Sequence, residues 1–90
     1  KLSRITCTVV LNNMVDIRRG QKALLDAAAA HSEVLQDKLN KPKVLFSLEP
    51  ALTLKLWCFI DDVNRKHIVL SELNQEIVTL FKKRGIEISV

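Results

Sequence analysis

The spacing of the apolar residues changes along this chain, and the order of those changes constrains the fold more than any other feature. Apolar and polar residues alternate over 4–11 and 86–90, and apolar residues occupy every second position of 43–48 and 52–60 with further apolar residues between them, which fits the two-residue period of β-strands. Residues 16–31 and 65–84 instead place apolar side chains three and four positions apart, as amphipathic helices do. The order strand, helix, strand, strand, helix, strand predicts an α+β fold. Its most economical form is a ferredoxin-like βαββαβ sandwich, with a four-stranded antiparallel sheet in the order 4-1-3-2 and both helices on one face.

The same periods predict which side chains form the core. The first helix is expected to open at Asp16 and end near His31, with a short extra turn over 33–37, and the second to stop at Lys82-Lys83-Arg84 before Gly85. The predicted core residues of the strands are Ile5, Cys7, Val9, Leu11, Val44, Phe46, Leu48, Leu52, Leu54, Leu56, Cys58 and Ile60. Those of the helices are Ile17, Leu24, Leu25, Ala28 and either Val34 or Leu35 in the first, and Leu70, Leu73, Ile77, Leu80 and Phe81 in the second.

The alternate strand positions define the opposite face of the sheet. This face is expected to carry Arg4, Thr6, Thr8, Lys55, Trp57 and Phe59. Bulky residues on both sides of 52–60 predict a central strand that is covered on both faces. Exposed aromatics beside cations are compatible with stacking of single-stranded RNA, with a protein–protein surface, or with a face covered by the rest of a parent protein, and we favour the last two. The glycine-aromatic signature of RNA-recognition domains is absent, because 52–60 contains no glycine.

Length and composition predict one domain, spanning residues 1–90. Two domains would each be too small for an adequate core, and two glycines and two prolines argue against a disordered or loop-rich chain. The net charge of +4 is weak evidence for an anionic partner. The chain starts at Lys1 without a methionine and ends within an apolar alternation, so we expect it to be a piece of a longer protein.

No motif in the chain predicts catalysis. Cys7 and Cys58 lie far apart and outside any CxxC pair, so we expect two buried thiols. His31 and His67 lie near helix ends without a nucleophile or ligand pattern, and we expect them to be solvated or capping residues. Asp61-Asp62 reads as a turn leading to a helix. We therefore predict no enzyme and no catalytic, cofactor-binding or metal-binding residues.

Several short motifs, taken together and in order, resemble one known family. They are Leu54-Lys55-Leu56-Trp57-Cys58-Phe59-Ile60-Asp61, Ser71-Glu72-Leu73-Asn74, Phe81, Gly85-Ile86-Glu87-Ile88, His31-Ser32-x-Val34-Leu35 and Pro42-Lys43-Val44-Leu45-Phe46. The pattern resembles the C-terminal cytoplasmic α/β domain of the mechanosensitive channels of small conductance. Two stretches depart from the family: 47–52 replaces its usual Phe-Gly-Asp-Ser-Ser-Leu, and 88–90 stands where Pro-Phe-Pro would begin.

The resemblance implies a function that the residues alone do not. The parent protein would be an ion channel of the bacterial inner membrane that opens under tension and relieves hypo-osmotic stress. This segment would line the cytoplasmic vestibule of a homo-oligomer, typically a heptamer, and contribute to assembly and solute filtering without a cofactor. Arg4, Lys55, Trp57 and Phe59 then become candidates for an inter-subunit or inter-domain face. The alternative is a free-standing ferredoxin-like module that binds single-stranded RNA or a small ligand.

Overall fold

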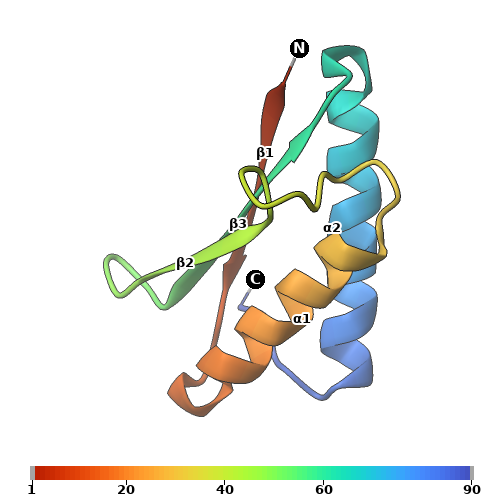
Figure 1. Cartoon of the computed structure of the whole chain (residues 1–90). Helices are drawn as coiled ribbons and strands as arrows, with labels where there is room; N and C mark the ends of the chain where they lie inside the picture. The colour runs from red at the N-terminus through yellow and green to blue at the C-terminus, as the bar shows by residue number, and fades with distance from the viewer. Residues whose placement is uncertain (1, 90) are drawn as a thin grey trace.

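Three antiparallel strands form the sheet. The computed structural model describes residues 2–89 and places β1 (Ser3–Val10), β2 (Lys43–Ser47) and β3 (Thr53–Ile60) in the order β1-β3-β2 (Figure 1). The pairing sets Ile5 opposite Cys58 and Val44 opposite Leu56. Because successive side chains point to opposite faces, this register gathers the apolar set of each strand on one side. The prediction that β3 is central is confirmed.

Both helices pack on that apolar side. α1 (Ile17–Ala30) and α2 (Lys66–Lys83) are each preceded by a 3₁₀ turn, η1 (Met14–Asp16) and η2 (Val63–Arg65). The side chains of Asn13 and Asp62 cap these turns by accepting from the N–H groups of Val15 and Asn64. Two helices on a three-stranded antiparallel sheet make an α+β fold, as the sequence predicts. No helix among the described residues is both long and apolar enough to span a membrane.

α1 lies close to the sheet because its buried face is made of small residues. Gly20, Ala23, Ala27 and Ala28 are buried there together with Leu24. A Cβ atom added to Gly20 would lie 2.8 Å from Cδ1 of Leu54 on β3, so the glycine permits this approach. The predicted stripe was wrong at one position, since Leu25 is 40% exposed. The buried face of the helix consists of the small residues and Leu24, and Leu25 lies outside it.

α2 contributes the larger core side chains. Val69, Leu73, Ile77 and Phe81 are buried, and Leu70 and Leu80 pack partly against them. The helix ends at the predicted place. Gly85 adopts a φ of 69°, a left-handed conformation that glycine tolerates, and the N–H of Ile86 donates to the carbonyl of Phe81.

β2 is a short edge strand that the helices cover only in part. Val44 packs against the core, whereas Phe46 is 40% exposed and Leu48, outside the strand, is 61% exposed. The prediction that both are core residues was therefore wrong, although Phe46 lies on the same side of β2 as Val44. Residues 33–37 are irregular rather than forming the expected extra helical turn, and the N–H of Leu35 donates to the carbonyl of Phe59.

The last predicted strand is reduced to one bridge within the described residues. Ile88 pairs antiparallel with Leu11, and the N–H of Ser89 donates to the carbonyl of Val10 over 2.7 Å. Ile86 is buried. The segment thus lies beside β1, where the order 4-1-3-2 puts it, but residues 2–89 hold three strands rather than four. Val90 lies outside the described residues.

Candidate functional site

The four predicted face residues lie together on the side of the sheet away from the helices. Arg4 is opposite Phe59 in the β1–β3 register, and Trp57 and Lys55 follow on alternate positions of β3. Arg4 and Lys55 are exposed, whereas Trp57 and Phe59 are half-buried. We call this surface, with its β2 members Lys43 and Leu45, the open face.

One contact organises the open face. The guanidinium carbon of Arg4 lies 4.3 Å from the centroid of the Trp57 ring, within the range of a cation–π interaction. Because Thr6 is the residue opposite Trp57, Arg4 reaches the ring along the diagonal of the strand pair. The stack holds a cation over the indole and restrains both side chains.

All charged side chains of the open face are positive. Arg4, Lys43 and Lys55 surround the two aromatic rings, and the described strand residues of this face include no carboxylate. Leu45 adds an aliphatic side chain that is 41% exposed. Such a surface suits a partner that offers apolar and acidic groups. The sequence prediction omitted Lys43 and Leu45, although the alternation that turned Val44 toward the core already implied their position.

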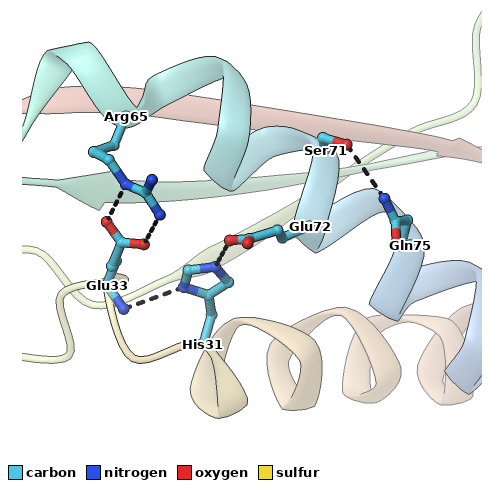
Figure 2. Close-up of polar contacts among 6 residues, drawn as sticks. All are labelled: His31, Glu33, Arg65, Ser71, Glu72 and Gln75. Carbon is cyan, nitrogen blue, oxygen red and sulfur yellow. Dashed lines mark hydrogen bonds and ion pairs between the residues drawn. The ribbon is translucent and has the colours of Figure 1, made fainter.

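A second polar cluster joins the end of α1 to α2, and the sequence did not predict it. Figure 2 shows His31 and Glu33, which follow α1, facing Arg65 and Glu72. Glu33 accepts two hydrogen bonds from Arg65, of 3.0 and 2.8 Å, and Nε2 of His31 lies 2.8 Å from Oε1 of Glu72. The hydrogen bonds and charge of Arg65 lower the pKa of Glu33, and Glu33 raises the pKa of Arg65.

This cluster brings three potential metal ligands within 4.8 Å of one another, from His31, Glu33 and Glu72. Its hydrogen bonds fit a different role. Nδ1 of His31 accepts from the N–H of Glu33 over 3.1 Å, so the proton of a neutral ring lies on Nε2 and is donated to Glu72 (Figure 2). A metal at Nε2 would move that proton to Nδ1, against the Glu33 N–H. The donor set therefore favours a structural link between the two helices.

The remaining chemical candidates have structural surroundings. Cys7 and Cys58 are buried free thiols, as predicted. Burial raises the pKa of Cys7 to about 11, and burial together with the neighbouring Cys7 raises the pKa of Cys58 to about 12. Asp62 caps η2, which agrees with the interpretation of this segment as the approach to a helix, and His67 is exposed on α2.

Comparison with known proteins finds similarity in structure alone. No known family profile matches the chain, and no curated protein sequence matches it. Two cryo-EM structures of MSL1 from Arabidopsis thaliana, one of them a single-residue variant, superpose on 100% of the chain with a TM-score of 0.80 and 16% sequence identity. A third MSL1 structure gives a TM-score of 0.67 at 12% identity. The chain spans 34%, 36% and 32% of the lengths of these three proteins. The match establishes a shared fold.

Proposed function

We propose that this chain is the C-terminal cytoplasmic α/β domain of a mechanosensitive channel of small conductance, with a ferredoxin-like core. One observation carries the proposal: the whole chain superposes at a TM-score of 0.80 on about a third of MSL1, an MscS-like channel. The motifs of 54–61, 71–74 and 85–88 resemble the same family in sequence, which is support independent of the superposition.

In this role the domain assembles with copies of itself and forms part of the vestibule wall through which solutes pass. The open face supplies a surface suited to that task, since aromatic and arginine side chains are enriched where proteins bind one another. The domain would be linked to a membrane through the rest of the parent channel. The motif resemblance implies the bacterial inner membrane, and the similar solved structures come from a plant.

The first test is to examine the sequence encoded upstream of Lys1 in the same reading frame. The proposal requires several apolar segments of about 20 residues before Lys1, since each must cross a bilayer. A frame without such segments would refute the channel assignment. If they are present, the full-length protein should produce tension-activated currents in patches from cells that lack their own mechanosensitive channels.

The open face makes a further prediction for the full-length protein. Trp57→Ala removes the indole and leaves Arg4 without its stacking partner. If the open face is an inter-subunit surface, the variant should weaken subunit association by about 2 kcal/mol, which is typical of an aromatic hot spot. Native mass spectrometry or sedimentation of the detergent-solubilised channel would measure this. Thr8→Ala, on the same face and on the other side of Trp57 from Arg4, is the matched control.

An unchanged assembly with Trp57→Ala, alongside a correctly folded subunit, would exclude the open face as the subunit contact. It would leave the channel assignment itself standing, because that assignment depends on the upstream segments and the currents.

The structure disfavours the RNA-binding alternative. A base that stacked on Trp57 would have to displace the Arg4 guanidinium, which already covers the ring at 4.3 Å. We expect no saturable binding of single-stranded RNA at low salt. A salt-dependent affinity that Trp57→Ala removes would reverse this conclusion.

A further inference from the structure

The open face and the outer side of α2 carry opposite charges and lie on opposite surfaces of the molecule. The sheet and the helices form two layers, so the open face is on one side and α2 is on the other (Figure 1). The charged members of the open face are all cations. Between His67 and Lys82, the charged residues of α2 are Glu72 and Glu76, and both are exposed. One chain therefore carries both members of a complementary pair of surfaces.

The outer side of α2 also offers apolar contact. Ile68 and Val78 are 47% and 50% exposed, although both are large aliphatic residues. Ile68, Glu72 and Glu76 recur every four residues, so they lie along one stripe of the helix. We call these three residues, together with Val78, the outer α2 face. Its mixture of aliphatic and acidic groups is what the cations and aromatic rings of the open face suit best.

A recess beside the two carboxylates can receive a cationic side chain. It lies between α1 and α2 and has a volume of about 270 Å³. α1 ends here without a basic residue in its last turn, so the partial negative charge of the helix end adds to that of the carboxylates. The recess is therefore a suitable place for the charged end of a lysine or arginine from another copy. Its lining residues are Ala27, Ala30, His31, Glu72, Leu73 and Glu76.

The spacing of the charges on the two faces also agrees. Glu72 and Glu76 are about one helical turn apart, which is roughly 6 Å. Lys43 lies opposite Trp57, and Lys55 precedes Trp57 by two positions on β3, so the two lysines are diagonal neighbours. Such neighbours are roughly 7 to 8 Å apart, and flexible lysine side chains can absorb the difference. One α2 helix laid across the open face can thus pair both carboxylates with lysines.

Two identical faces would not fit one another. The open face has three cations and no carboxylate among its described strand residues, so no relative orientation of two open faces pairs a cation with an opposite charge. Two outer α2 faces would likewise bring Glu72 and Glu76 against the same carboxylates. Like charges that meet across an interface disfavour association. A head-to-tail contact between the open face and the outer α2 face pairs opposite charges.

From these observations we propose that the open face of one subunit binds the outer α2 face of the next. Lys43 and Lys55 would lie beside the carboxylates of the neighbouring copy, and its Ile68 would pack near the ring of Trp57. The inference rests on the proposed function, because it names the surface that the open face contacts in the assembled protein. Since the two faces are on opposite sides of the domain, the contact repeats from copy to copy and closes into a ring if the rotation per copy permits.

Paired charge reversals in the full-length protein test this contact. Lys55→Glu and Glu76→Lys should each weaken subunit association about tenfold, since each sets like charges across the interface. The two changes together exchange the charges and should restore association to within about threefold of wild type. Arg18→Glu makes the same charge change on the exposed first turn of α1 and is the matched control, which should associate normally.

Sedimentation or native mass spectrometry of the detergent-solubilised protein measures association, and circular dichroism melts verify that each variant folds. If the single reversals leave association unchanged, or if the double variant associates no better than the single ones, the proposal is wrong.

Cross-linking identifies which faces meet. A protein with Lys55→Cys and Glu76→Cys together should form a ladder of linked subunits with a short bismaleimide, and neither single variant should do so. Cys7 and Cys58 are buried and should contribute little background. Dimers formed by Lys55→Cys alone would show that two open faces meet, and a correctly assembled double variant without the ladder would show that another surface covers the open face. Either result overturns the proposal.

Failure of this contact and failure of the channel assignment give different results. The reversals and cross-links report on subunit association alone, whereas the channel assignment depends on the upstream apolar segments and the tension-activated currents. Currents without rescue by the double reversal would reject the contact and leave the channel assignment standing. Rescue in a protein without upstream apolar segments would reject the channel assignment and support the contact.

Discussion

Gly20 offers the most direct test of how α1 packs on the sheet. In a typical helix, replacing glycine by alanine stabilises by about 1 kcal/mol, because the free backbone loses less entropy. Here the added methyl carbon would lie 2.8 Å from Cδ1 of Leu54 and 3.7 Å from Cζ of Phe81. Both of those side chains are fully buried, so neither has free space to move into.

The packing cost should exceed the helix-propensity gain. Inserting a methyl group into a filled core typically costs 1 to 3 kcal/mol, roughly twice the stabilisation expected from alanine. We therefore expect Gly20→Ala to lower the free energy of unfolding by about 1 kcal/mol. For a chain of this size that corresponds to a fall in Tm of roughly 4 to 8 °C.

Urea denaturation followed by circular dichroism measures the effect, and Leu54→Val supplies the control. Valine lacks the Cδ1 atom that the new methyl would meet, so Gly20→Ala should be neutral or stabilising in that background. The resulting coupling energy should be of the order of 1 kcal/mol, as is usual for residues in contact. A Gly20→Ala protein that is more stable than wild type, or a cycle without coupling, would refute the close approach of α1 to β3.

Two further predictions concern titratable groups. Because Arg65 lowers the pKa of Glu33, the stabilisation from this pair is present above the ordinary glutamate value near 4.5 and is lost as the pH falls through the lower folded-state value. The stability difference between wild type and Glu33→Gln should therefore shrink on acidification below pH 4.5. Cys7 and Cys58, with pKa values raised to about 11 and 12, should resist a thiol reagent at pH 8 until the protein is unfolded. Fast labelling of the folded chain would contradict their burial.

The elements with a strong period were predictable from the sequence. β1 alternates apolar and polar residues over most of its length, and both faces of β3 carry bulk, so position and central placement followed from the residues alone. The end of α2 was also predictable, since cations followed by Gly85 form a complete stop signal.

The wrong predictions of burial concern residues whose exposure depends on tertiary packing rather than on the spacing of apolar residues. Leu25 is more apolar than Ala23 or Ala27, yet the alanines are buried because a small face lets the helix approach the sheet closely. Phe46 has the correct parity for the core, but the edge strand that carries it extends beyond the helices. Neither outcome is encoded in a local pattern.

The two polar sites differ in the same way. The members of the open face share parity on neighbouring strands, so their common side was predictable, but the stack of Arg4 on Trp57 depends on a register that a sequence does not state. The contacts among His31, Glu33, Arg65 and Glu72 join segments up to 41 residues apart, and no spacing rule connects them.

The short edge strand β2 also affects whether copies of the protein can polymerise by strand pairing. A chain that adds to its neighbour edge to edge can form a fibre only if each copy offers two accepting edges. Here β2 is short and preceded by Pro42, so a copy bound through β1 would present a poor template to the next. Edge-to-edge growth through β2 is therefore disfavoured, which limits the risk of runaway aggregation through the described sheet.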